Sequence, residues 1–177
     1  MSGLNTNGSV VWITGLSDSG KTTVATILTQ RLRQNGNSII MLDGDQLRKI
    51  FGATKQHDRE SRLKLASRYA GLCKILAAQG QRVVIATISM FREIHAWNRE
   101  NIPGYFEVYL KTPMEELRRR DTKGIYQRFD SGELNNVYGL DFKADEPENP
   151  EILIEFDPHK TAEDVVAIIE SNLKKYF

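Results

Sequence analysis

The chain has 177 residues, of which 40% are apolar and 27% are charged. This is an ordinary globular composition, which excludes disordered, collagen-like and coiled-coil proteins. The length predicts a single domain over residues 1–177, with room for at most a small lid. The formal net charge of +1 provides no broad cationic surface, so we expect no nucleic-acid partner.

Three further features predict a cytoplasmic protein without a membrane partner. The longest strongly apolar stretches, Ser38–Leu42 and Val83–Ile88, are far shorter than the roughly twenty residues that cross a bilayer. The polar N-terminus lacks the basic and apolar regions of a secretory signal. Cys73, the single cysteine, cannot form an internal disulfide, which fits a reducing compartment.

Strands and helices are predicted to alternate along the chain. The first strand, Ser9–Thr14, is followed by a glycine-containing loop and a helix over Lys21–Asn35 that ends before Gly36. Further strands are predicted over Ser38–Leu42, Arg82–Ile88, Tyr105–Leu110 and Ile152–Phe156. Further helices are predicted over Gln46–Phe51, Ser61–Gln79, Arg92–Asn101, Pro113–Asp121 and Thr161–Tyr176.

This alternation predicts an α/β fold in which a parallel sheet is covered by helices on both faces. The segment from about residue 122 to 150 breaks the pattern, because it is weakly periodic and long for a connection. Such segments are typical of lids and binding loops, and we expect a mobile lid here.

The loop after the first strand has the pattern G-x-x-x-x-G-K-[ST]. Backbone N–H groups of such a loop wrap phosphate oxygens, which requires glycine where a Cβ would block the approach. Lys21 supplies a charge to the β- and γ-phosphates and Thr22 a hydroxyl for Mg²⁺. The alternative is a chance match in a glycine-containing turn. The predicted nucleotide-binding residues of the loop are Gly15, Ser17, Asp18, Ser19, Gly20, Lys21, Thr22 and Thr23.

Asp18 is unexpected within this loop. A carboxylate close to a triphosphate is repulsive unless it points outward or meets a cation. The sequence leaves open whether Asp18 weakens nucleotide binding.

Two acids, Asp43 and Asp45, follow the second predicted strand. Ligands of open parallel sheets lie beyond the carboxyl ends of the strands, where these acids are expected. One carboxylate can orient Mg²⁺, and the other can accept a proton from an attacking hydroxyl. For Asp45 the alternative is the N-cap of a helix.

Arginines and polar residues are expected at the same edge. Arg62 lies on the inward face at the start of the long helix, where it is placed to bind an anion, with a solvated first-turn residue as the alternative. Arg48 is one helical step after Asp45, and for it a surface salt bridge is the alternative. Ser89 and Phe91 follow the third strand, and Phe91 suits the core equally well.

The expected lid carries Arg120, Lys123, Tyr126 and Arg128, whose cations can neutralise a transferring phosphoryl group. The alternative interpretation is that these cations only complement the helix dipole at a helix C-terminus. His95 and His159 lack metal-ligand spacing and are expected at the surface, whereas Cys73 is expected in the core.

With these residues the chain resembles the adenylylsulfate kinases, from Val11 to about Phe156. The resemblance is carried by GLSDSGKTT, LDGDQLR, ISMFR, KTPMEELRRRDTKGIY and a GLD…PENPE stretch, in this order and spacing. It implies a P-loop α/β fold with a mobile lid, an ATP-dependent transfer to the ribose 3′-hydroxyl of adenylyl sulfate, and a homodimer.

The resemblance also implies roles for individual residues. Lys21 and Thr22 look like ligands of ATP and Mg²⁺, Arg120 like a nucleotide contact, and Asp45 like the catalytic aspartate. The expected metal ligands are Thr22 and Asp45. Acceptor-site residues, including those named above for the strand ends, are expected to be Asp43, Arg48, His57, Arg62, Ile88, Ser89, Lys123 and Tyr138.

The chain departs from the family pattern only on the acceptor side. His57 and Val137 stand where the family has two aromatic residues around the base, and Leu65 stands where it has an asparagine. Loss of stacking costs about 1–3 kcal/mol per base, which favours a related acceptor. The precedent is the adenylylsulfate-kinase-like enzymes of capsule-sugar modification that act on cytidine diphosphoramidate, and Tyr138 or His57 can still cover one face of such a base.

Two alternatives belong to other functional classes. A GTPase-like switch needs a guanine-reading N-K-x-D segment, which the sequence lacks. A non-catalytic nucleotide-binding module is suggested by Asp18 in the phosphate loop.

Overall fold

The computed structural model describes residues 8–52 and 58–173. In this part of the chain, five strands form one parallel sheet in the order β2-β3-β1-β4-β5. The strands are β1 (Ser9–Thr14), β2 (Ile39–Asp43), β3 (Arg82–Ala86), β4 (Tyr105–Lys111) and β5 (Ile152–Glu155). The predicted α/β architecture is confirmed.

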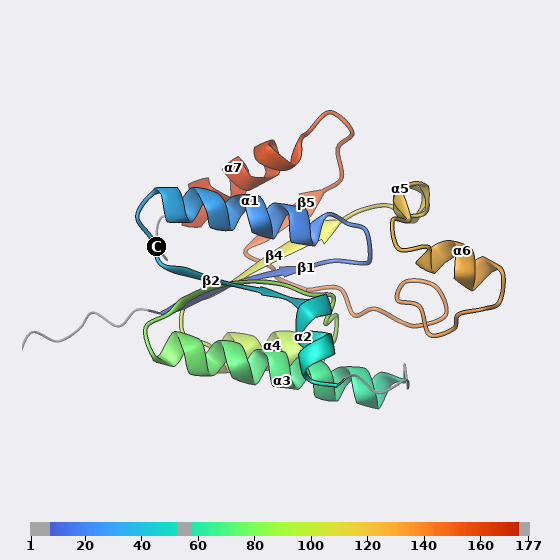
Figure 1. The fold of residues 1–177 in the computed structure, drawn as a ribbon, viewed down its shortest axis with the longest axis horizontal. Helices are drawn as coiled ribbons and strands as arrows, with labels where there is room; N and C mark the ends of the chain where they lie inside the picture. The colour runs from blue at the N-terminus through green and yellow to red at the C-terminus, as the bar shows by residue number, and fades with distance from the viewer. Residues whose placement is uncertain (1–7, 53–57, 174–177) are drawn as a thin grey trace, which may run out of the picture.

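Helices cover both faces of the sheet (Figure 1). On one face lie α1 (Lys21–Gln34) and α7 (Ala162–Leu173), and on the other lie α3 (Arg59–Ala78) and α4 (Arg92–Asn101). Three short helices lie near the carboxyl ends of the strands: α2 (Gly44–Ile50), α5 (Met114–Arg120) and α6 (Ile125–Asp130).

The strands are buried on both sides, which explains their continuous apolar runs. In β1, Val11 and Ile13 pack with α1 and α7, whereas Val10 and Trp12 face the cluster that includes α3 and α4. The alternation follows from the period of two in a strand. Because all four pairings between the described strands are parallel, the carboxyl ends of the five strands lie at one edge of the sheet.

The segment from residue 122 to 150 forms a third, smaller cluster beyond this edge. Leu117, Tyr126 and Val137 are buried together there. The sequence prediction missed helix α6, because a helix of six residues gives little periodicity. Asp121 accepts hydrogen bonds from the N–H groups of Tyr126 (3.1 Å) and Gln127 (2.9 Å), and so holds the start of this helix.

The structure corrects the prediction for His95. This side chain is only 8% exposed, on the face of α4 that also buries Ile94 and Asn98, and is not a surface residue. Burial lowers its pKa. His159 is exposed and Cys73 is buried in the core, as predicted.

Candidate active site

The phosphate loop turns between β1 and α1 with the geometry that its glycines predict. Gly15 has φ +153°, and a Cβ at this position would approach the carbonyl oxygen of Leu110 to 2.6 Å. Gly20 has φ +93° at the start of α1. Glycine is therefore required where the loop closes against β4 and where it enters the helix.

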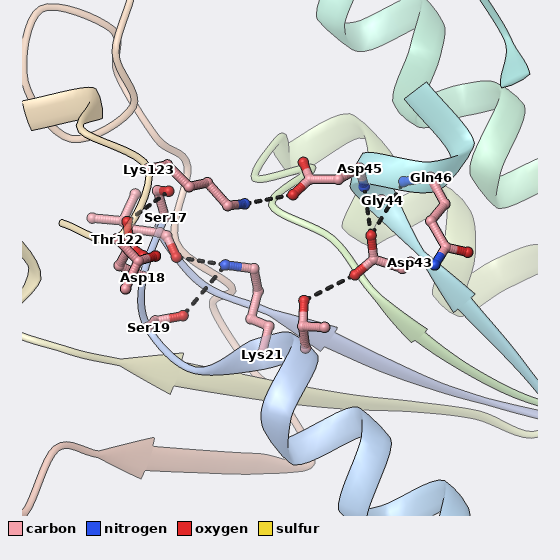
Figure 2. Close-up of polar contacts among 12 residues, drawn as sticks. Ser17, Asp18, Ser19, Lys21, Asp43, Gly44, Asp45, Gln46, Thr122 and Lys123 are labelled. Carbon is pink, nitrogen blue, oxygen red and sulfur yellow. Dashed lines mark hydrogen bonds and ion pairs between the residues drawn. The ribbon is translucent and has the colours of Figure 1, made fainter. Parts of the chain in front are cut away.

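Lys21 places a half-buried amino group inside this loop. Its Nζ donates to the carbonyl oxygen of Leu16 over 2.5 Å and lies 3.4 Å from Oγ of Ser19 (Figure 2). Within residues 8–52 and 58–173, Lys21 forms no ion pair. Burial, and next the charge of Lys123, lower its pKa to about 7. An ammonium group without a carboxylate partner, at the N-terminus of α1, fits a phosphate group.

Thr22 and the acid turn after β2 are joined directly. The Thr22 hydroxyl donates to Oδ2 of Asp43 over 2.9 Å. The other oxygen of Asp43 accepts the N–H groups of Asp45 (2.9 Å) and Gln46 (3.2 Å). Asp43 is therefore the N-cap of α2, and the alternative that assigned the cap to Asp45 is wrong. A hydroxyl beside a carboxylate is the oxygen donor set that Mg²⁺ prefers.

Asp45 keeps its carboxylate free of the helix cap and directed across the site. Nζ of Lys123 donates to its Oδ2 over 2.5 Å, as Figure 2 shows. Partial burial disfavours the charged form, but the hydrogen bond and charge of Lys123 hold the pKa of Asp45 below its ordinary value. This carboxylate is ionised at neutral pH, as a proton acceptor must be.

These residues line a cleft of about 1030 Å³ at the carboxyl edge of the sheet. The volume lies at the upper end of the range for ligand sites. Among the predicted site residues, the cleft is lined by Ser17, Asp18, Gly20, Lys21, Thr22, Thr23, Asp43, Asp45, Arg48, Arg62, Ile88, Ser89, Arg120, Lys123 and Tyr138. Gly15 and Ser19 belong to the loop but not to the lining, and His57 lies outside the described residues.

Arg62 packs against two aromatic rings that also contact each other, with their centroids 4.7 Å apart. Its guanidinium carbon lies 4.7 Å from the ring centre of Tyr138 and 4.9 Å from that of Phe142. One nitrogen donates to the carbonyl oxygen of Asn136 over 2.6 Å. Burial lowers the pKa of Arg62, although its charge is retained at neutral pH. The solvated first-turn alternative does not hold, since the side chain is half-buried.

The turn after β3 forms the floor of this half of the cleft. The carbonyl oxygen of Ile88 accepts a 2.5 Å hydrogen bond from Thr14. Ser89 is buried with φ +36°, and its hydroxyl lies 2.8 Å from that of Thr87. Phe91 serves both of its predicted roles, because it is 1% exposed in the core and still lines the cleft.

Leu65 and Val137, two of the residues that depart from the family pattern, lie at different places relative to the cleft. Leu65 lines the cleft beside Arg62. Val137 instead packs with Leu117 and Tyr126 in the small apolar cluster of the 122–150 segment and is not a lining residue. Tyr138, the next residue, faces the cleft.

The sequence prediction missed the contacts that hold the 122–150 segment against the phosphate loop. Thr122 donates a hydrogen bond to the Asp18 carboxylate, and Arg120 donates to the Asp18 carbonyl oxygen over 3.1 Å. The buried hydroxyl of Tyr126 donates to the carbonyl oxygen of Ser17 over 3.1 Å. More than one hundred residues separate these partners, so the local pattern contains no signal for the contacts.

A family model described as adenylylsulphate kinase matches residues 7–155. The chain belongs to the adenylylsulfate kinase family. It is therefore an ATP-dependent phosphotransferase, which sets aside the GTPase-like switch and the non-catalytic module considered from the sequence.

Individual members of the family resemble the chain over most of its length. It is 41% identical over 145 residues to a cytidine diphosphoramidate kinase of Campylobacter jejuni, which covers 82% of this chain and 85% of that protein. It is 36% identical over 172 residues to a probable adenylyl-sulfate kinase of Aeropyrum pernix, covering 94% and 93% of the two chains. The structure of Mycobacterium tuberculosis APS kinase in complex with AMPPNP and APS superposes with a TM-score of 0.87 at 31% identity, covering 95% of this chain and 98% of that one.

No helix in the described ranges is long and apolar enough to span a membrane.

Proposed function

We propose that this adenylylsulfate kinase family member transfers the γ-phosphoryl group of ATP to the ribose 3′-hydroxyl of a nucleotide that also carries a compact anionic group. The observation that carries the proposal is the ionised carboxylate of Asp45, which lines the cleft with Lys21 and is paired with Lys123 rather than with the helix cap. A phosphate cradle alone needs no such carboxylate, whereas transfer to an alcohol needs a proton acceptor.

On the donor side, Lys21 and the amides of the phosphate loop bind the triphosphate. Thr22 and Asp43 are the proposed holders of Mg²⁺, and the ion neutralises charge on the phosphate oxygens when it is bound. Arg120 lies over the ring of Phe156, with its guanidinium carbon 5.1 Å from the ring centre, and is placed to contact the nucleotide.

On the acceptor side, Asp45 accepts the proton of the attacking hydroxyl. Lys123 lies beside it, where a cation stabilises charge that develops on the transferred group. Arg62 offers its guanidinium to the anionic group of the acceptor, and the planes of Tyr138 and Phe142 restrict its orientation. Such fixed donors contribute to catalysis because they need no reorganisation during the reaction.

For the acceptor itself we favour cytidine diphosphoramidate. Leu65 supplies no polar side-chain group to the cleft, and Val137 does not line it, so position 137 adds no stacking surface for a purine. A pyrimidine needs less stacking area. The 41% identity to a cytidine diphosphoramidate kinase supports the same choice. Adenylyl sulfate is the second candidate, supported by the adenylyl-sulfate kinases among the relatives.

The test is an acceptor panel with purified protein, ATP and Mg²⁺, following ADP formation. Cytidine diphosphoramidate, adenylyl sulfate and plain nucleoside diphosphates are compared by kcat/KM. We expect cytidine diphosphoramidate to exceed adenylyl sulfate by about tenfold or more, the effect of one base-stacking contact. Equal efficiency with adenylyl sulfate would contradict our assignment of the acceptor.

A variant pair sharpens this panel. Leu65→Asn introduces a polar group into the cleft and should raise the efficiency of adenylyl sulfate relative to the cytidine acceptor. Ser67→Asn, on the exposed face of the same helix, is the control and should leave the ratio as it is. If both variants shift the ratio alike, Leu65 does not determine specificity.

We also propose that the protein forms a homodimer in the cytoplasm and that the 122–150 segment acts as a lid. Sedimentation of the purified chain tests the dimer, and a monomer at micromolar concentration would remove it. Hydrogen exchange of residues 122–150 with and without ATP tests the lid, which requires slower exchange in the bound state.

A further inference from the structure

Asp18 is the one acidic side chain of the phosphate loop, and its carboxylate contacts the 122–150 segment. One carboxylate oxygen accepts the Thr122 hydroxyl, and the other accepts the Ser17 hydroxyl at 3.2 Å. The backbone at Asp18 has φ +61°, a conformation that aspartate tolerates better than most residues. Since a carboxylate near a triphosphate is repulsive, its presence requires a compensating role.

The other contacts that the loop makes with the end of α5 and with this segment do not depend on which residue occupies position 18. Arg120 donates to the carbonyl oxygen of Asp18, and Tyr126 donates to that of Ser17. Any amino acid supplies these backbone acceptors. Apart from the local hydrogen bond from Ser17, only the hydrogen bond from Thr122 needs an acceptor side chain at position 18, so this bond is the carboxylate's specific contribution to holding the segment.

Thr122 immediately precedes Lys123, whose ammonium group reaches Asp45. Thr122 and Lys123 are both exposed, so packing against the core restrains neither side chain. The residue before them, Asp121, has φ +24°, which turns the backbone sharply out of α5. A bond that fixes the Thr122 side chain therefore limits where the next residue can place its long side chain. Asp18, Thr122, Lys123 and Asp45 form one chain of contacts across the mouth of the cleft (Figure 2).

We propose that Asp18 is a positioning residue, whose carboxylate fixes Thr122 and thereby places Lys123 over Asp45 before nucleotide binds. The kinetic consequence rests on the proposed roles of Lys123 and Asp45 in phosphoryl transfer. The Asp18 carboxylate weakens the attraction for ATP but holds Lys123 in place on the acceptor side. Because Lys123 is already positioned, it need not be ordered during the reaction.

The structural arm of the test uses the protein without nucleotide. Asp18→Gly removes the carboxylate and suits the positive φ, so this variant is expected to fold. Thr122→Val removes the donor at nearly constant volume, and Asp18→Asn keeps an acceptor oxygen without the charge. Hydrogen exchange is measured at the amides of Gly124, Tyr126, Gln127 and Arg128, which are bonded to Asp121 or Gly124 at the start of the segment.

We expect these amides to exchange about tenfold faster in Asp18→Gly and in Thr122→Val, the effect of one lost hydrogen bond. Amides of β1 serve as the internal control and should not change. Asp18→Asn should restore most of the protection. Unchanged exchange in both loss variants would overturn the proposal, whatever the identity of the acceptor.

The kinetic arm separates positioning from simple repulsion. In Asp18→Gly we expect kcat to fall about tenfold while the KM for ATP stays equal or falls. Thr122→Val should lower kcat to a similar extent, and the double variant should be no worse than either single variant. Asp18→Asn should recover kcat. An unchanged kcat with tighter ATP binding in Asp18→Gly would mean that Asp18 acts by repulsion alone. Failure of every acceptor in the panel would disprove the proposed function but leave the exchange result valid.

Discussion

The Thr22 hydroxyl donates a 2.9 Å hydrogen bond to the Asp43 carboxylate and thereby joins the start of α1 to the end of β2. If these two oxygens hold Mg²⁺, Thr22→Val should raise the Mg²⁺ concentration needed for half-maximal activity by about tenfold. Activity is measured in a magnesium titration at fixed ATP. Thr26→Val, one turn further along α1, is the control, and an equal shift in this variant would exclude a specific role for Thr22.

The half-buried amino group of Lys21 predicts a trade-off between stability and activity. Its pKa is about 7 in the folded protein against an ordinary value of 10.5. Between these values the unfolded chain binds a proton that the native protein lacks, so this group makes stability rise with pH across that window.

Lys21→Met should therefore raise the urea midpoint at pH 6, and the gain should shrink by pH 10. Phosphoryl transfer should be lost in the same variant. The exposed Lys49→Met is the control and should give no pH-dependent gain. A gain that is constant with pH would show that Lys21 is not desolvated.

Asp45→Asn tests the proton acceptor. The variant keeps the size of the side chain and cannot accept the proton, so kcat should fall by about a hundredfold to ten-thousandfold. Binding of an ATP analogue, measured by calorimetry, should change little, since Asp45 lies on the acceptor side. Turnover close to that of the unmodified protein would remove Asp45 from its proposed role.

Arg99 supports the return of the chain from the 122–150 segment into β5. It donates to Glu107 over 3.1 Å, to Glu151 over 2.5 Å and to the carbonyl oxygen of Asn149 over 2.9 Å. Glu107 is 1% exposed, so Arg99→Ala leaves a buried carboxylate without its cation. We expect the free energy of unfolding to fall by about 3 kcal/mol in urea denaturation.

The matched control for Arg99 is Arg118→Ala. Arg118 pairs with Asp130 at the surface, and removal of such a pair costs about 1 kcal/mol or less. An equal loss of unfolding free energy in the two variants would mean that the buried network around Glu107 stabilises the protein no more than a surface ion pair does.

Cys73 is predicted to be chemically inert in the folded protein. Its side chain is fully buried in the core, and burial raises the pKa of the thiol to about 12. Because only the thiolate reacts, a thiol reagent at pH 8 should modify the native protein no faster than the protein unfolds. Rapid labelling without denaturant would contradict this burial.

The amino-acid sequence by itself determined the order of the strands and helices and the presence of the phosphate loop. These features have local causes. Apolar runs bury strands such as Ser9–Thr14 on both faces, and a glycine at position 15 or 20 adopts backbone angles that other residues avoid. The parallel sheet then follows from the alternation of elements, and with it the edge at which Lys21, Asp45 and Arg62 gather.

Only the tertiary structure decided which role each of the site residues has and which distant residues they contact. Asp43 and Asp45 are equivalent in the sequence, but one caps α2 and the other faces Lys123, because the end of β2 directs their side chains differently. The sequence predicts a surface position for His95, but the side chain is buried. Its burial depends on how α4 packs against the sheet, which the sequence pattern does not show. The bond between Asp18 and Thr122 joins residues 104 positions apart. Such contacts depend on side-chain directions set by packing between distant segments, which no local pattern encodes.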